Sequence, residues 1–195
     1  MSGRRYEIYD VFTSEVLKGN PLAIVHDAEG LDDGTMQKIA REFNLSETVF
    51  VLPAKNPAHT AQARIFTPDY EMPFAGHPTV GTAISVAQNR FGSAAGEHDA
   101  LIILEEQVGP VRCGVRLGKD GAFAEFDLPK LPQRVDYNYD KVAIARALRL
   151  EPDEIGFENH VPSIWDAGVP FLLVPIHGLA AAGRLRIDQA ARRGG

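Results

Sequence analysis

The stretch RIFTPDYEMPFAGHPTVGTA, residues 64–83, decides the fold of this chain. It begins with β-forming residues, turns at Thr67-Pro68-Asp69, and enters a helix near Pro78, because proline's missing N–H is tolerated in the first helical turn. The residues that follow, as far as Ala87, include no charged side chain. A helix that is apolar or small on every side is normally buried, so the sequence predicts strands wrapped around a central helix.

The start of this helix is a candidate binding site. Its first N–H groups have no partner inside the helix, and the helix dipole is positive there, which suits a carboxylate or another anion. The alternative is a core helix with a tight entrance and no ligand. The residues alone leave both interpretations open.

Composition excludes several classes of protein. The 195 residues are 45% hydrophobic and 24% charged, as in ordinary globular proteins, and the net charge of -6 argues against nucleic acid or an anionic membrane as the main partner. No apolar run reaches the length of a membrane span, and the N-terminal residues lack the apolar core of a signal peptide. The single cysteine, Cys113, excludes an intrachain disulfide and is expected to be buried in a strand rather than catalytic. We therefore expect a cytoplasmic location.

Short β-type runs flank the central helix on both sides. We expect strands at 6–12, 22–26, 48–52, 61–66, 101–104, 111–117 and 122–128. A helix is expected over 33–43, between an N-cap at Asp32 and a stop at Asn44, since asparagine tolerates the left-handed conformation. The central helix is expected to end near residues 91–92. The predicted class is therefore α+β, with a mixed sheet curled around one buried helix.

The pattern changes beyond the last of these strands. An amphipathic helix is expected over 140–150, a strand over 171–174 and a weak helix over 179–191, but a second buried helix is missing. We place a soft domain boundary between Arg112 and Gly118. The predicted domains are residues 1–114 and a partial second domain, residues 115–195.

Glu47 is the acid most suited to chemistry, because it lies between the end of a predicted helix and the start of an apolar strand. A carboxylate at the edge of apolar structure tends to have its charged form disfavoured, which favours acid–base use near neutral pH. The alternative is a solvated glutamate at the start of a strand.

His77, at the entry to the central helix, could bind a ligand or transfer a proton. A histidine satisfied by the backbone is the alternative. The other histidines are scattered without the spacing of metal ligands, so we expect no metal site. The glycines at 76 and 81 do not form a phosphate-binding fingerprint, and no Gly-x-Ser-x-Gly nucleophile motif is present.

Three motifs in order, GNPLAIV (19–25), MQKIAREFNLSETVFV (36–51) and residues 64–83, resemble the phenazine-biosynthesis PhzF-like family of isomerases. A weaker stretch, GVPFLLVPI (168–176), resembles the second domain of that family. The resemblance implies a diaminopimelate-epimerase-like fold, in which two similar domains each curl a sheet around a central helix. The family's active site lies between the two domains.

The resemblance also implies cofactor-free proton transfer on a small carboxylated molecule, which in the phenazine enzymes is a dihydro-hydroxyanthranilate. Glu47 corresponds to the general acid/base of the family, and His77 is its expected catalytic partner. Gly76, His77 and Thr79 correspond to the loop and helix start that hold the substrate. Asn20 corresponds to a residue that lines the pocket.

The chain departs from the family after Leu117. The Asp-Pro-Ala-Thr-Gly-Ser type motif that opens the second central helix does not occur there, so the second domain is expected to be incomplete. Unpaired strands would then favour a homodimer. Two other functions remain open: a catalytically inactive binding or interaction protein, and an amino-acid racemase, which normally needs a pair of thiols that one cysteine cannot supply.

Overall fold

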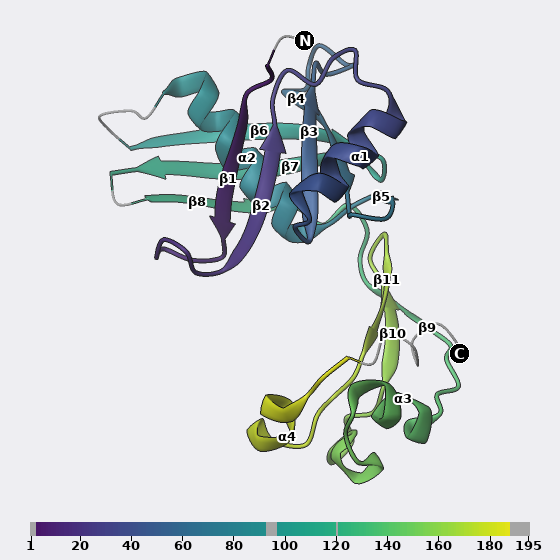
Figure 1. Ribbon diagram of the computed structural model, residues 1–195. Coiled ribbons are helices and arrows are strands. Elements are labelled where there is room, and N and C mark those ends of the chain that lie inside the picture. The colour runs from purple at the N-terminus through teal and green to yellow at the C-terminus, as the bar shows by residue number, and fades with distance from the viewer. Residues whose placement is uncertain (1–2, 93–96, 120, 188–195) are drawn as a thin grey trace. The chain divides into compact units, whose positions relative to one another are not determined.

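The computed structural model describes residues 3–92, 97–119 and 121–187. The chain forms two compact units, the first ending at Lys130 and the second beginning at Leu131. Figure 1 shows the helices and strands of both units.

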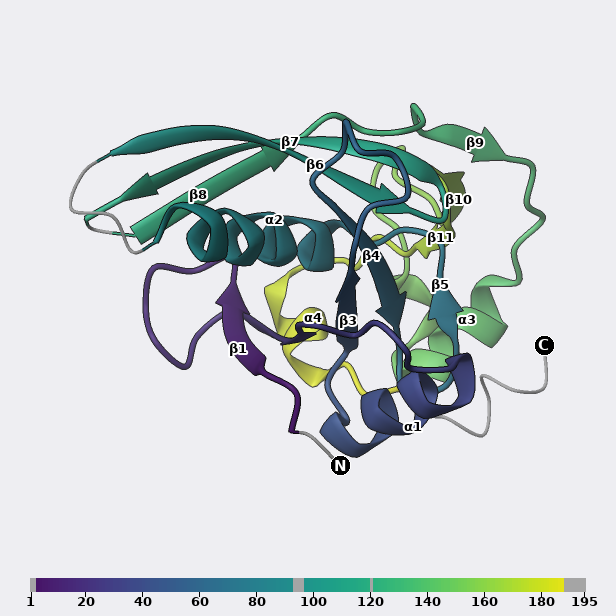
Figure 2. The same ribbon diagram turned by 90° about the horizontal axis from the view of Figure 1, so that it is seen from above.

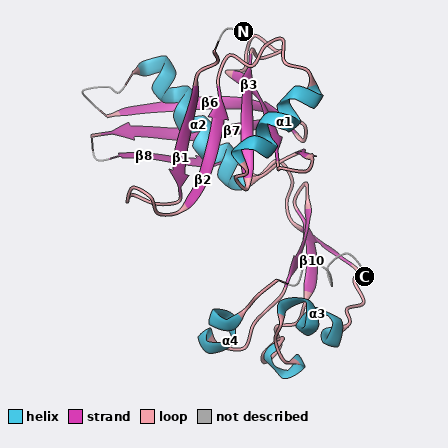
Figure 3. Ribbon diagram, in the orientation of Figure 1, coloured by secondary structure: helices cyan, strands magenta, loops and turns pink. Residues whose placement is uncertain are grey.

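The first unit is built on one mixed sheet with the strand order β1-β2-β3-β4-β6-β7-β8, and β5 pairs with β4. The β2–β3 and β4–β6 pairs are parallel, and the other neighbours are antiparallel. Figure 3 shows the strands in magenta and the helices in cyan. The strands are β1 (Tyr6–Val11), β2 (Asn20–Val25), β3 (Glu47–Leu52), β4 (Ala61–Phe66), β5 (Glu71–Met72), β6 (His98–Glu106), β7 (Gly109–Gly118) and β8 (Gly121–Phe126).

The sheet curls around helix α2 (Gly76–Phe91), which packs against every strand of the main path from β1 to β8 (Figure 2). Small residues allow this close approach. A Cβ atom added at Gly81 would lie 2.6 Å from Leu22 Cδ2 and 2.9 Å from Val11 Cγ2, so only glycine fits there. The α+β fold with a curled sheet around a buried central helix is confirmed. The helix begins at Gly76, earlier than the predicted start at Pro78, which lies within the first turn instead.

Helix α1 (Asp33–Phe43) covers β3 and β4, and its predicted ends are confirmed. The side chain of Asp32 accepts a hydrogen bond from the Thr35 N–H, and Asn44 adopts the left-handed conformation with φ 51°. Met36 and Ala40 are buried in a core cluster that also contains Phe50 and Phe66. This helix therefore fixes where β3, and with it Glu47, begins.

The second unit contains a three-stranded sheet, in the order β11-β10-β9, and a small core of its own. Its elements are β9 (Gln133–Val135), helix α3 (Lys141–Leu148) with Asp140 as N-cap, the 3-10 turn η1 (Pro152–Glu154), β10 (Ser163–Asp166), β11 (Pro170–Leu173) and helix α4 (Leu179–Arg184). The predicted helix over 179–191 is shorter than expected, and its part beyond residue 187 lies outside the described residues. In the described part of the chain, no helix is long and apolar enough to cross a membrane.

The first compact unit extends beyond the boundary that the sequence suggested at 114/115. That position lies inside β7, which stays paired with β6 on one side and with β8 on the other. The strands as far as Phe126 therefore belong to the sheet of the first unit. The boundary between compact units falls in the segment that follows β8.

Candidate functional site

Two candidate residues meet at the start of α2. Glu47 is the first residue of β3, and parallel pairing with β2 places it opposite Leu22. His77 is the second residue of α2. Its Nδ1 lies 3.2 Å from Oε2 of Glu47, and the two side chains are 8% and 15% exposed, respectively. The structure therefore brings together the two residues that the sequence predicted as catalytic.

Each side chain of this pair has a buried polar atom that could still form a hydrogen bond. The 3.2 Å contact between Nδ1 of His77 and Oε2 of Glu47 does not have the geometry of a hydrogen bond. Within the described residues, neither this Oε2 nor Nε2 of His77 therefore has a hydrogen-bond partner, although both atoms are buried. A buried polar atom without a partner costs about 1–3 kcal/mol, so such atoms are rare unless they serve a purpose. The arrangement suits a ligand that supplies the missing hydrogen bonds.

Burial shifts both groups toward their neutral forms. It raises the pKa of Glu47, because the carboxylate has lost water and no opposite charge offsets that loss. It lowers the pKa of His77, and a hydrogen bond with the Pro21 backbone opposes that change in part. A carboxyl group with a raised pKa can accept and return a proton near neutral pH.

The other predicted site residues lie on the same elements. Gly76 opens α2, and a Cβ added there would make ordinary contact with Phe126, at 3.6 Å. Asn20 opens β2 opposite Val11 and is half-buried. Among the described residues, the Asn20 side chain forms neither a hydrogen bond nor an ion pair with Glu47 or His77. The place of Asn20 in the pocket stays a prediction.

Thr79 is buried, and its hydroxyl already has two partners inside the protein. Its Oγ1 lies 2.8 Å from the Ala75 carbonyl oxygen and 2.7 Å from Oε1 of Glu106. Its contact with substrate stays a prediction. The hydroxyl itself fills a structural position within the first turn of α2.

Glu106, the last residue of β6, was not recognised in the sequence. It is 7% exposed, and burial raises its pKa to about 8, although the hydrogen bond with Thr79 opposes this rise. Its Oε2 has no partner in the described part of the chain. The alternation along β6 contained the signal, because Ile102 and Leu104 share its inward face while Glu105 points to the other side. We call Glu47, His77, Thr79 and Glu106 the entrance cluster.

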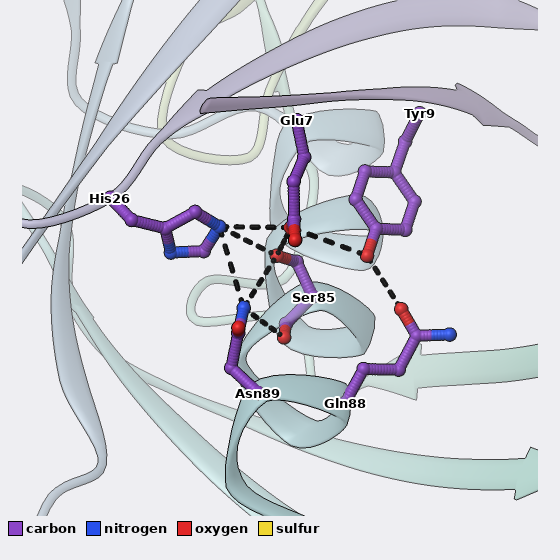
Figure 4. Close-up of polar contacts among 6 residues, drawn as sticks. All are labelled: Glu7, Tyr9, His26, Ser85, Gln88 and Asn89. Atoms are coloured by element: carbon purple, nitrogen blue, oxygen red, sulfur yellow. Dashed lines mark hydrogen bonds and ion pairs between the residues drawn. The ribbon is translucent and has the colours of Figure 1, made fainter. Parts of the chain in front are cut away.

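A second polar cluster lies farther along α2 (Figure 4). Oε2 of Glu7 accepts a hydrogen bond from Ser85 at 2.6 Å and lies 2.9 Å from Nε2 of His26, and Asn89 donates to the Ser85 carbonyl at 2.9 Å. Tyr9 joins through Gln88, at 2.5 Å. We call these residues the distal cluster, defined by Glu7, Tyr9, His26, Ser85, Gln88 and Asn89.

The distal cluster has the residue types of a Ser–His–acid triad but not its geometry. A triad uses one ring nitrogen for the serine and the other for the acid. Here Ser85 Oγ, at 3.1 Å, and Glu7 Oε2 both meet Nε2 of His26. No proton relay can therefore run through the ring from acid to serine. The cluster ties β1 and β2 to α2.

No group of three or more His, Cys, Asp or Glu side chains in the described residues could hold a metal ion. Cys113 is buried in β7, as predicted, and burial with the nearby carboxyl groups of Glu106 and Asp127 raises its pKa to about 12. Such a thiol is not a ready nucleophile, because little of it is ionised at neutral pH.

Comparison with known proteins gives one family. The family described as phenazine biosynthesis-like protein matches residues 9–193. An uncharacterized isomerase of Mesorhizobium japonicum is 58% identical over 191 residues, which are 98% of this chain and 62% of that protein. A trans-2,3-dihydro-3-hydroxyanthranilate isomerase of Pseudomonas chlororaphis is 36% identical, over 95% of this chain and 62% of that enzyme. The chain thus spans less than two thirds of the length of these relatives.

Solved structures agree with the sequence matches. A predicted epimerase from Pseudomonas aeruginosa superposes with a TM-score of 0.83 and 32% identity, over 98% of this chain and 65% of that one. A PhzF-family phenazine biosynthesis protein from Bacillus anthracis gives 0.75 and 29%, over 94% and 59% of the two chains. A hydroxyproline epimerase from Agrobacterium vitis, 13% identical with a TM-score of 0.53, shares the fold alone.

Proposed function

Because the chain belongs to the phenazine biosynthesis-like family of isomerases, we propose that it isomerises a small carboxylated molecule by proton transfer and without a cofactor. In this proposal Glu47 takes a proton from one carbon of the substrate and returns it to another. The electron pair of the broken C–H bond shifts through the substrate, so no oxidant or reductant is consumed. The net reaction moves a hydrogen atom and a double bond.

The observation that carries this proposal is the buried Glu47–His77 pair with an unpartnered atom on each side chain. His77 would donate to or accept from a polar group of the substrate, because its Nε2 is the unpartnered ring nitrogen. Gly76 begins a helix of 16 residues, whose first N–H groups suit the substrate carboxylate. Asn20 would line the proposed site, and Thr79 would hold the helix start beside it.

The test is exchange of solvent deuterium into trans-2,3-dihydro-3-hydroxyanthranilate, the substrate named for the Pseudomonas chlororaphis relative. The Glu47→Gln variant keeps the shape of the side chain but cannot act as a base, so the rate should fall by about 10²–10⁴-fold. Glu42→Gln is the matched control, because it removes the same charge from an exposed position of α1. Equal exchange by wild type and Glu47→Gln would contradict the proposal.

The second candidate is a protein that binds such a carboxylate without converting it. The helix start favours this candidate, because its N–H groups and the Glu47–His77 pair suit a bound carboxylate whether or not a proton is transferred. Calorimetric binding of the same acid, without deuterium incorporation by wild type, would select binding over catalysis. Glu47-dependent conversion would exclude it.

We also propose that the protein works in the cytoplasm as a homodimer. All four residues of β11 are exposed, and the strand pairs with β10 on one side. An unpaired apolar strand edge favours association with another chain. Light scattering after size-exclusion chromatography should give twice the mass of 21.3 kDa, and a monomer would refute this part of the proposal.

A further inference from the structure

We propose that Glu106 is an uncharged carboxylic acid in the folded protein, donates a hydrogen bond to Thr79, and thereby positions the first turn of α2. Glu106 is a positioning residue in this view and does not touch the reacting atoms. The protonation and the hydrogen bond stand independently of the activity. Only their effect on turnover rests on the proposed isomerisation.

The hydrogen atoms around Thr79 support this assignment. The Thr79 hydroxyl has one hydrogen, yet its oxygen lies 2.8 Å from the Ala75 carbonyl and 2.7 Å from Oε1 of Glu106. A carbonyl oxygen can only accept. If Glu106 were ionised, both neighbours would be acceptors, and one of the two short contacts would have no hydrogen. If Glu106 carries the proton, it donates to Thr79, Thr79 donates to Ala75, and both contacts are hydrogen bonds.

The surroundings of Glu106 also favour the neutral acid. It is 7% exposed, and no Lys, Arg or His of the described residues pairs with it. Arg64, which lines the same cavity of about 880 Å³, is bonded to Glu71 and Asp33, and His59 is bonded to Glu105. An isolated buried carboxylate would be costly, so the group keeps its proton instead.

Titratable and charged groups reach this region from several elements, and within the described residues none of them forms an ion pair with Glu106. They are His77 on α2, Arg64 on β4, Glu71 on β5, Glu105 on β6, Cys113 on β7, Asp127 after β8, and Lys55 and His59 between β3 and β4. Lys55 is exposed, and the cations Arg64 and His59 are bonded to other acids. Cys113 is neutral because its pKa is raised to about 12, in part by Glu106. None of these groups supplies the positive charge that would ionise Glu106.

The proton on Glu106 affects the position of His77 through the first turn of α2. The Ala75 carbonyl, at the N-cap, receives both the Thr79 N–H, at 3.2 Å, and the Thr79 hydroxyl. The N-cap residue, Ala75, provides no side-chain hydrogen bond to this helix start. The chain Glu106–Thr79–Ala75 therefore holds the turn on which His77 stands. Removal of the Glu106 proton would break this chain and loosen the turn.

The sign of the pH dependence follows from the raised pKa. The unfolded chain releases this proton near the ordinary value of 4.5, whereas the folded protein holds it to about pH 8. The stabilising effect of the protonated form is thus complete below pH 4.5 and is lost as pH rises through about 8. We expect both thermal stability and the order of the α2 entrance to decline over this range.

Infrared spectroscopy tests the protonation directly. The difference spectrum of wild type minus Glu106→Gln at pH 6 should show one buried carboxylic-acid C=O band, which should disappear above pH 8. Glu106→Gln keeps an N–H donor toward Thr79, so its Tm should nearly match wild type at pH 4.5 and exceed it by about 5 °C or more at pH 9.

Glu105→Gln is the matched control from the neighbouring position. Glu105 accepts hydrogen bonds from the Lys55 and Asn56 N–H groups, which lower its pKa, so it is ionised, and its variant should lose Tm at both pH values. The proposal is overturned if wild type lacks the carboxylic-acid band at pH 6, or if wild type and Glu106→Gln have parallel Tm profiles. Neither readout needs turnover, so an inactive protein would refute the proposed function and leave this test intact.

Discussion

Helix α2 contributes to two polar clusters that differ in how completely their buried atoms are bonded. In the distal cluster, every buried side-chain nitrogen and oxygen of the described residues has a partner. In the entrance cluster, one buried atom on each of three side chains has none: Glu47 Oε2, His77 Nε2 and Glu106 Oε2. Both clusters combine at least one acid, a histidine and at least one hydroxyl group. The difference teaches that bonding, rather than residue type, separates a structural cluster from a candidate site.

Substitution of the two histidines should give the largest difference between the two clusters. His26→Ala leaves Glu7 and Ser85 without their shared partner and opens space in the core, so it should lower the free energy of unfolding by about 2–4 kcal/mol. His77→Ala should reduce stability less and reduce deuterium exchange more. Urea unfolding of both variants, with exchange normalised to folded protein, measures this contrast. Equal losses of stability would show that both clusters are structural.

Substitution of Gly81 and of Gly76 tests how tightly α2 packs at these two positions. Gly81→Ala would place a methyl group 2.6 Å from Leu22 Cδ2, and this overpacking should cost about 1–3 kcal/mol. Gly76→Ala meets only Phe126, at 3.6 Å, and should leave the free energy of unfolding nearly unchanged. A loss of exchange activity in a stable Gly76→Ala protein would support a ligand at the helix start. Similar stabilities for the two variants would mean that the sheet relaxes around Gly81.

Removal of single hydroxyl groups from α2 should change the free energy of unfolding by a smaller amount. Ser85→Ala removes the donor to Glu7 and should cost about 1–2 kcal/mol. Thr82→Val replaces a buried hydroxyl that has no partner in the described residues with a group of similar shape, so stability should stay level or increase. Chemical denaturation distinguishes them. A larger loss for Thr82→Val would reveal a bonded hydroxyl.

Acid titration should give the smallest effect, and its direction differs between the clusters. Burial acts to raise the pKa of Glu7, but hydrogen bonds with Ser85 and His26 outweigh it and lower the pKa. Its stabilising effect is therefore present above the unfolded pKa of about 4.5 and is lost as pH falls below it. Glu47, with a raised pKa, acts in the opposite sense. Glu7→Gln should flatten the acid limb of the Tm profile, and Glu47→Gln should not.

Local sequence signals predicted much of the fold. The caps of α1, the strand Ala61–Phe66 and the apolar character of α2 depend on residues close in sequence, and each was predicted. The strands β5, β9 and β10 have two to four residues, too few for a recognisable alternation. The helix start was misplaced because Pro78 is tolerated anywhere in the first turn.

The site residues divide in the same way, into those indicated by local sequence and those set by contacts between distant parts of the chain. Glu47 and His77 became candidates because each stands at the end of a recognisable element, and the resemblance of the surrounding motifs to the family favoured Glu47 as the acid/base. The distal cluster and Glu106 were missed because their bonds join residues far apart in sequence: Ser85 to Glu7 across 78 positions, and Thr79 to Glu106 across 27. Only the folded sheet brings such groups together. For Glu106 alone, the alternation along β6 would have sufficed.

The position of α2 in the chain has a consequence for synthesis on the ribosome. Strands β1 to β4 precede the helix and β6 to β8 follow it, yet all of them pack on it. The first four strands therefore leave the ribosome with their inner apolar face uncovered. In addition, β4 cannot pair with β6 until the helix between them has been synthesised. Such a nascent chain exposes aggregation-prone surface over many residues of translation, so we expect it to depend on chaperones.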